Sequence, residues 1–192
     1  MIDALPVGAL AAGMSWASGL RLYMALFTAG WFGYMGWIDL PASLQVLQSP
    51  YVLSVTGMLT LVEFLADKVP GVDSAWDAIH TFIRIPAGAV LAAASFGDIN
   101  PVWTTVAAIL GGTVAAGAHA TKAGSRALIN TSPEPVSNWT ASVTEDATVA
   151  GGLMAAFFFP WLLFPFLAIF FLLAIWLLPK VWRSLRSIFK RV

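Results

Sequence analysis

The amino-acid sequence predicts an all-α integral membrane protein with about six transmembrane helices. Of its 192 residues, 59% are hydrophobic and only 10% are charged, whereas a soluble domain carries about 25% charged residues. Residues 149–179 contain no ionisable side chain, and an apolar run of about 18 residues or more is long enough to cross a bilayer. We therefore expect one transmembrane domain over residues 1–180.

Six helices account for the apolar segments of this domain. They are predicted near residues 5–35, 50–67, 74–96, 103–130, 137–159 and 161–180. The loop "GWIDLPASLQVLQS" separates the first helix from the second, and "GDINP" separates the third from the fourth. Pro70 and Pro133 each end a helix, and Ser74 and Ser137 follow them where an N-cap belongs.

The boundary before the last helix is the one that the sequence marks least. "FFFPWLLFP" contains two prolines and no polar turn, so five spans with a long, kinked last helix is the competing count. Residues 181–192 form a basic, amphipathic segment, which predicts a cytoplasmic tail because Lys and Arg concentrate on that side. Six spans bring Lys68, Arg84, Lys122 and Arg126 to the same side, so both termini are expected in the cytoplasm.

An internal repeat underlies the middle of the chain. Residues 65–93 lie over residues 128–156 without a gap at a shift of 63 residues, and ten positions are identical, among them a proline, a serine and a tryptophan. The repeat predicts two tandem helix–Pro turn–helix units, about residues 45–100 and 108–163. Two helices per unit make the units parallel, a symmetry known from transporters, whose sites lie at the repeat interface.

Polar side chains recur at helical spacing on four of the predicted helices. The stripes are Thr56, Thr60, Glu63 and Asp67; Asp73, Asp77, His80 and Arg84; His119, Lys122, Arg126 and Asn130; and Asn138, Ser142 and Glu145, with Asp146 beside the last. A charge that faces lipid costs about 2.5–3.5 kcal/mol, so we expect the stripes to converge at the cytoplasmic end. Under the repeat, Glu63 falls on Arg126, and these opposite charges are predicted to meet.

Nine of these residues form the candidate site for a substrate or ion. They are Glu63, Asp67, Asp77, His80, Arg84, Lys122, Arg126, Asn130 and Glu145. A divalent metal is a second use of the third helix, where Asp73, Asp77 and His80 could offer two carboxylates and an imidazole, although Arg84 one turn later opposes a cation. Otherwise no cofactor is evident. A third use is a proton relay through His80, since an imidazole titrates near neutral pH.

Each of these residues also has a purely structural interpretation, in which Asp77 pairs with Arg84 and His80 packs between helices. The repeat offers an argument against it for the third helix. The equivalent positions in the fifth helix are Val136, Thr140, Val143 and Ala147. A duplicated scaffold would keep structural pairs in both copies, so this asymmetry favours a functional role.

Three segments carry a resemblance to a known family. "LVEFLADKVPGVDSAWDAIHTFIRIPAGA", "HATKAGSRALINTSPEPVSN" and "LLPKVWRSLRSIF" resemble the bacterial membrane family catalogued as domain of unknown function 4126. The resemblance implies a multi-pass protein of the bacterial inner membrane with a shared polar core, and no activity comes with it. The family has an "AGLNAY"-like segment where this chain has "SGLRLY", so Arg21 stands in place of an asparagine.

The function predicted from these observations is that of a small transporter or channel. Mixed charge argues against a simple cation pore and suits protons or a small polar or anionic substrate. The alternatives are a lipid-handling protein that binds a phosphate head group, with a metal-dependent membrane enzyme as its extension, and an assembly protein without substrate. Membrane lipid is an expected partner, a homo-oligomer is compatible with the sequence, and nucleic acid is not expected. An enzyme is the weaker hypothesis, because the sequence names no nucleophile.

Overall fold

The computed structural model describes residues 4–69, 71–97, 101–131 and 135–189, and within these ranges every regular element is a helix. The all-α class is therefore confirmed. The helices are α1 (Ala4–Tyr34), the 3-10 helix η1 (Ala42–Gln48), α2 (Pro50–Ala66), α3 (Val72–Phe96), α4 (Pro101–Ile129), α5 (Pro135–Phe158) and α6 (Pro160–Phe189). Pro70, Pro133 and residues 98–100 of the loop "GDINP" lie outside the described residues.

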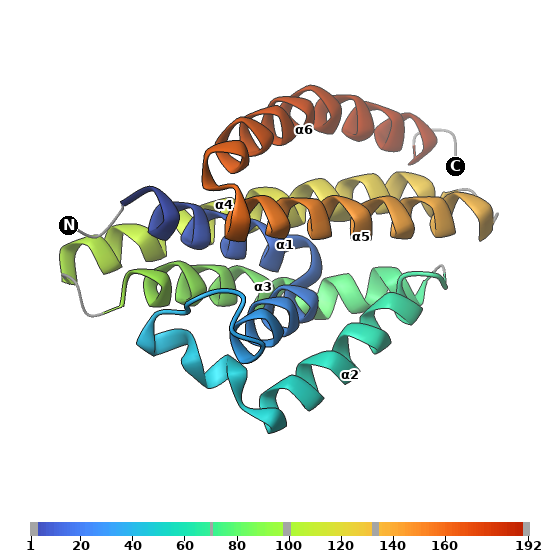
Figure 1. Cartoon of the computed structure of the whole chain (residues 1–192). Coiled ribbons are helices and arrows are strands. Elements are labelled where there is room, and N and C mark those ends of the chain that lie inside the picture. The colour runs from blue at the N-terminus through green and yellow to red at the C-terminus, as the bar shows by residue number, and fades with distance from the viewer. Residues whose placement is uncertain (1–3, 70, 98–100, 132–134, 190–192) are drawn as a thin grey trace.

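Helices α3 and α4 form the most extensive helix pair and run antiparallel beside each other. In Figure 1 the axis of α5 is roughly aligned with the axes of α3 and α4. Helix α6 covers α4 and α5, and α2 crosses obliquely on the other side of the bundle. The core lies around the first half of α1, where Trp16 is fully buried and meets Phe166 and Phe170 of α6 edge to face. The bundle is thus assembled around α1.

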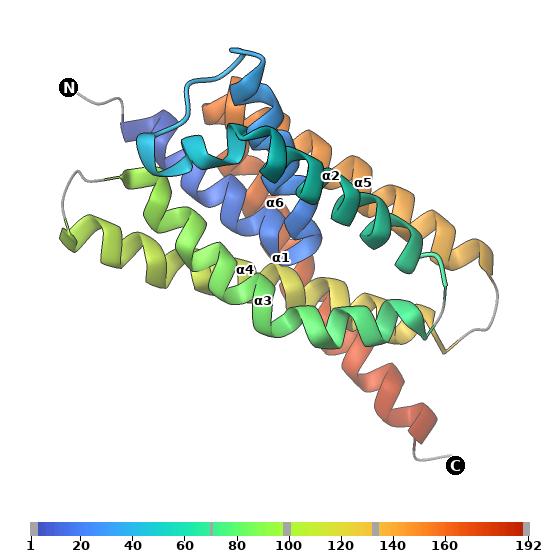
Figure 2. The ribbon, with the colours of Figure 1, turned by 90° about the horizontal axis from the view of Figure 1, so that it is seen from below.

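The boundaries of α2 to α5 have the spacing that the repeat predicts. Helices α2 and α4 end at Ala66 and Ile129, and α3 and α5 begin at Val72 and Pro135. Both the two ends and the two beginnings are 63 residues apart, the shift found in the sequence. The ends of α2 and α4 and the beginnings of α3 and α5 lie at the same end of the bundle (Figure 2).

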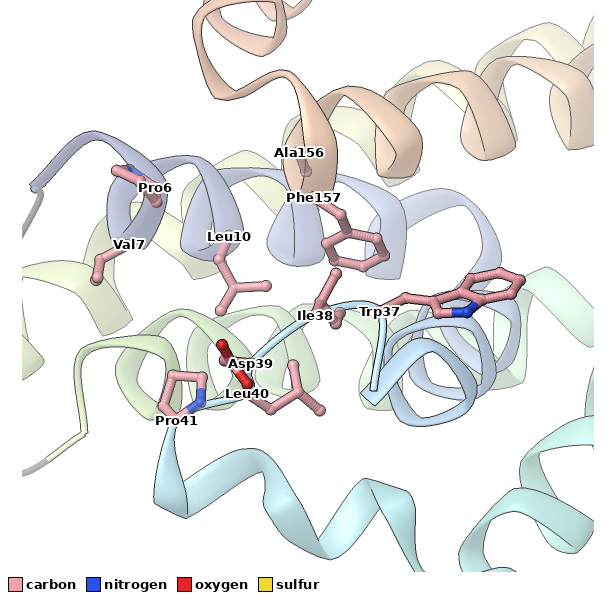
Figure 3. A pocket seen from close by; sticks show the side chains of 10 residues that line it. All are labelled: Pro6, Val7, Leu10, Trp37, Ile38, Asp39, Leu40, Pro41, Ala156 and Phe157. Atoms are coloured by element: carbon pink, nitrogen blue, oxygen red, sulfur yellow. The ribbon is translucent and has the colours of Figure 1, made fainter. Parts of the chain in front are cut away.

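Helix α1 is broken in its middle and turns back. Arg21 has φ −143° and ψ 75°, which is not helical. Residues near the start of α1 and residues 37–41, which follow it, face each other across one pocket of 490 Å³ (Figure 3). That pocket is also lined by Ala156 and Phe157 at the end of α5. Both halves of α1 therefore reach the same end of the bundle, and α1 does not form a single straight span.

Within the described ranges, three helices are long and apolar enough to cross a membrane: α3, α4 and residues 160–184 of α6. A fourth span results if η1 and α2, which meet at 70°, are counted as one. The count of six spans is not confirmed, because α1 is interrupted at Arg21 and α5 carries Glu145 and Asp146 near its middle.

The two ends of the described chain lie toward opposite ends of the bundle. Figures 1 and 2 both place the start of α1 where α3 ends, and the end of α6 on the side of the turn after α2. Six straight spans would have brought both termini to one face. The predicted tail is not a separate element either, since α6 continues through Pro179 to Phe189.

Candidate functional site

Ten charged side chains join into one network, which we call the buried charge network. Its acids are Glu63, Asp67, Asp73, Asp77, Glu145 and Asp146, and its bases are Arg21, Arg84, Lys122 and Arg126. Eight of the ten are buried, and only Glu145 and Asp146 keep some exposure. The expected convergence of the polar stripes is therefore what the structure contains.

Arg84 holds the α2–α3 side of the network. Its Nη2 lies 2.5 Å from Glu63 Oε1, and its Nη1 lies 2.6 Å from Asp77 Oδ1. The pairing of Asp77 with Arg84 on one face of α3 is thus confirmed. The predicted meeting of Glu63 with Arg126 is wrong, because Arg84 occupies the place beside Glu63.

Arg126 of α4 pairs with Glu145 of α5. Its Nε and Nη2 donate to the two Glu145 carboxylate oxygens at 3.0 and 2.9 Å, a two-pronged geometry that only a guanidinium offers. Its Nη1 donates to the Asp67 backbone carbonyl at 3.1 Å. The carbonyl at the end of α2 is thereby tied to both helices of the second unit.

Lys122 connects three other helices to α4. Its Nζ lies 3.0 Å from Asp67 Oδ2 and 3.2 Å from Asp77 Oδ1. The same nitrogen donates to the Leu20 carbonyl of α1 at 3.4 Å. Leu20 directly precedes the break in α1, so Lys122 lies at the end of the first half of that helix.

Arg21 stands at the break and was not among the predicted site residues. Its guanidinium contacts Asp67, lies 2.9 Å from Asp146 Oδ1 and donates to Ser142 Oγ at 3.1 Å. The signal in the sequence was a lone arginine inside an apolar helix, where an ionisable group marks a functional position by default. Asp146 was left out of the predicted site as well, although it flanks the stripe of α5.

The two histidines lie beside the network on different sides. His80 stacks on Trp76 and shares a hydrogen bond of 3.1 Å with the Tyr23 hydroxyl, so its ring faces α1 rather than the carboxylates. His119 lies 3.4 Å from Arg84 Nη1 through Nδ1 and 2.6 Å from the Thr81 hydroxyl through Nε2. Because a guanidinium can only donate, Nδ1 accepts and the proton of neutral His119 belongs on Nε2.

Three carboxylates come together at the end of the network toward the turn after α2. One oxygen each from Asp67, Asp73 and Asp77 lies within 4.8 Å of the others, and all three side chains are buried. Asn130 donates to Asp73 Oδ2 at 3.1 Å and to the Ser74 hydroxyl at 2.9 Å. Asp73 and Asp77 therefore lie together, whereas His80, the third residue considered for a metal, does not join them.

Lys68, in the turn after α2, lies next to the network without a carboxylate partner of its own among the described residues. Its Nζ donates to the Phe64 carbonyl at 3.0 Å and lies over the Phe64 ring. Burial lowers the pKa of this amine below its ordinary value, and the nearby carboxylate of Asp146 acts in the opposite direction.

Two of the hollows that reach the network lie on different sides of the bundle, and a third, of 470 Å³, shares Ser125, Thr144 and Glu145 with the second of them. The first, the α2 hollow, has a volume of 440 Å³ and is lined by Arg21, Met24, Phe27, Thr28, Thr60, Leu61, Glu63, Phe64 and Asp146. The second, the α6 hollow, has a volume of 110 Å³ and is lined by Leu20, Thr121, Lys122, Ser125, Thr144, Glu145, Thr148 and Phe170. Since α2 and α6 cover opposite sides of the bundle (Figure 1), the charge network separates the two hollows.

Comparison with known proteins identifies one similarity. The model of the family described as "Domain of unknown function (DUF4126)" matches residues 9–180. No curated protein and no solved structure matches the chain.

Proposed function

The chain belongs to the family of domain of unknown function 4126, and from the geometry of the buried charge network we propose that it is a small membrane transporter. The observation that carries the proposal is the break of α1 at Arg21, inside a charge network that has a hollow on each side. Transporters bind their substrates at interrupted helices of this kind, near the interface of their repeats.

The physical argument concerns the backbone at the break. Non-helical backbone at membrane depth is tolerated only where it is buried in protein or lines a cavity. Here the Leu20 carbonyl before the break accepts from Lys122, and Arg21 itself pairs with Asp67 and Asp146. A plain structural bundle would be more stable with an uninterrupted α1, so the break favours a binding role.

The walls of the two hollows indicate the class of substrate. Arg21, Glu63 and Asp146 face the α2 hollow, and Lys122 and Glu145 face the α6 hollow. Each hollow thus offers both signs of charge, which suits a small zwitterion or an anion accompanied by a proton and not a bare cation.

The proposed location is the bacterial inner membrane, with the end of α6 in the cytoplasm. Lys180, Arg183 and Arg186 cluster in this part of the helix. Because basic residues concentrate on the cytoplasmic side of membrane proteins, their position supports this orientation.

The lipid-handling alternative has less support. A phosphate head group is an anion and needs a pocket with an excess of bases, whereas Arg84, Lys122 and Arg126 lie in a network whose carboxylates outnumber its bases. The assembly alternative predicts no water path to the network. The accessibility of the two hollows to a water-soluble reagent therefore distinguishes it from transport.

Single cysteines measure that accessibility directly, since the chain contains no native cysteine. Thr60→Cys in the α2 hollow and Thr148→Cys in the α6 hollow are each expected to react with a charged, membrane-impermeant thiol reagent. In proteoliposomes of known orientation, a transport path through the network requires that the two positions react from opposite sides of the membrane.

Two controls frame this measurement. Ala17→Cys, at a fully buried position, should stay unlabelled, and Arg183→Cys near the end of α6 reports the orientation. Labelling of both hollows from one side only, or of neither hollow, would contradict a transport path and favour an assembly role.

A further inference from the structure

The charges of the buried network do not balance. Six carboxylates are joined to four bases by the ion pairs described above, and Lys68 beside them is the fifth base. Even with Lys68 included, the described residues leave one more acid than base. An uncompensated buried charge is costly, and a buried acid removes that cost by taking up a proton.

Asp73 is the acid with the weakest compensation. Within the described part of the chain, its one ion pair joins Oδ2 to Arg126 Nη1 at 4.0 Å, and Arg126 directs its Nε and Nη2 at Glu145 instead. The other five acids each have a base nitrogen at 3.0 Å or less. Asp73 is nevertheless fully buried.

The surroundings of Asp73 also leave acceptors for a proton. Asp67 faces it from the end of α2, Asp77 from its own helix, and Arg126 and Asn130 from α4, while Glu145 of α5 acts on it through Arg126. One carboxylate oxygen of each of three acids is buried without a hydrogen-bond partner among the described residues. These atoms are Asp67 Oδ1, Asp73 Oδ1 and Asp77 Oδ2.

We propose that Asp73 is a proton-binding site, and that its proton is the coupling ion of the transporter. Proton uptake from water forms one O–H bond on the Asp73 carboxylate and removes one negative charge from the cluster that Asp73 forms with Asp67 and Asp77. Release breaks that O–H bond and returns the charge. The coupling role rests on the proposed transport function, whereas the proton site itself does not.

A metal ion fits the same cluster less well. Lys122 lies at 3.0 and 3.2 Å from Asp67 and Asp77, and Arg21 also contacts Asp67, so cations already occupy the side of the cluster where a metal would bind.

The repeat relates two residues that lie beside Asp73. At the shift of 63 residues, Asp67 corresponds to Asn130, and both lie beside Asp73. Asn130 has an amide where the first unit has the carboxylate of Asp67. It therefore adds no negative charge beside Asp73, and it donates a hydrogen bond to Asp73. Asn130 therefore stabilises the ionised form of Asp73, the state that remains after the proton is released.

Infrared spectroscopy of the purified protein in detergent tests the proton site without any transport assay. A protonated carboxyl has a carbonyl band that a carboxylate lacks. We expect this band in mildly acidic solution and its loss as the pH is raised. Asp73→Asn should remove it, and the matched change Asp39→Asn, at an exposed acid outside the network, should leave it in place.

A second variant keeps the test decisive where Asp73→Asn does not fold. Asn130→Leu removes a hydrogen bond to the charged form of Asp73, so the loss of the band should move to higher pH. Wild-type protein without the band, or with a band unchanged by Asp73→Asn or by Asn130→Leu, would overturn the proposal.

A metal is tested in the same samples. Mn²⁺ added to the wild-type protein should keep the electron paramagnetic resonance spectrum of the free ion. A spectrum of immobilised Mn²⁺ in the wild-type protein, which reverts to the spectrum of the free ion in Asp73→Asn, would show that the cluster binds a metal and not a proton. Since neither measurement involves flux, the proton site and the transport path can fail independently.

Discussion

Replacing Arg84 with glutamine is expected to lower the free energy of unfolding by about 3–5 kcal/mol, the usual cost of breaking a buried ion pair from one side. Arg84 is fully buried and lies within 2.6 Å of both the Glu63 and the Asp77 carboxylates. Glutamine would leave two carboxylates in the core with one neutral donor between them. The measurement is unfolding in detergent, followed by circular dichroism.

The control for Arg84→Gln is the same change at Arg183, an exposed arginine whose side chain donates to the Pro179 carbonyl. This change should stay within about 0.5 kcal/mol of wild type. Adding Glu63→Gln to Arg84→Gln should recover part of the loss, because the double variant carries one fewer unpaired charge. Polar contacts between helices in membranes average about 0.6 kcal/mol, so a loss of only that size would contradict the cost expected for leaving a buried charge unpaired.

Helical periodicity was enough to predict the polar centre of the protein. Asp77 and Arg84 are seven residues apart, which places them on one face two turns apart, and they do pair. The same spacing grouped Glu63 with Asp67 and Lys122 with Arg126. These residues meet because an ionisable side chain in an apolar bundle has few alternatives to another charge.

Symmetry was a less reliable guide than periodicity. The repeat places Glu63 on Arg126, but it also places Arg84 on Ala147. Only the first unit has a base on its second helix, and this base is the one that pairs with Glu63. Glu63 thus pairs with Arg84, a residue present in only one unit, and an argument from symmetry between the units does not consider such a residue.

The turn of α1 could not be predicted from the sequence around it. Residues on both sides of Arg21 are apolar, so hydropathy suggests one straight span. The break is stabilised by contacts distant in the sequence, with Asp67, Ser142 and Asp146. The predicted count of six spans included α1 as one straight helix. For that reason the all-α fold class was predicted better than the number of spans.

Gly19→Ala is the substitution with the second large expected effect, because α1 crosses α4 at Gly19 at a distance that leaves no room for a side chain. A Cβ atom on Gly19 would collide with the Ala115 carbonyl oxygen and lie 2.8 Å from Ala118 Cβ. The first obstacle is backbone inside a long helix and cannot move aside as a flexible side chain would. Gly19→Ala should therefore destabilise the protein at or above the upper end of the range of about 1–3 kcal/mol for overpacking.

Gly151→Ala is the matched control, since Gly151 lies inside α5 and a Cβ atom added there would meet nothing within 4 Å. There, alanine should stabilise the helix by about 0.5–1 kcal/mol, because it restricts the unfolded backbone more than glycine does. The same substitution is thus expected to have opposite signs at the two positions, measured as melting temperatures in detergent.

The physical reason for the effect at Gly19 reaches the proposed site. Gly19 precedes Leu20, whose carbonyl accepts from Lys122, so the close crossing positions the broken end of α1 against the charge network. Equal melting temperatures for Gly19→Ala and Gly151→Ala would show that α1 and α4 do not approach this closely. The break in α1 would then lose its place beside Lys122, and with it the structural basis for a binding role at that point.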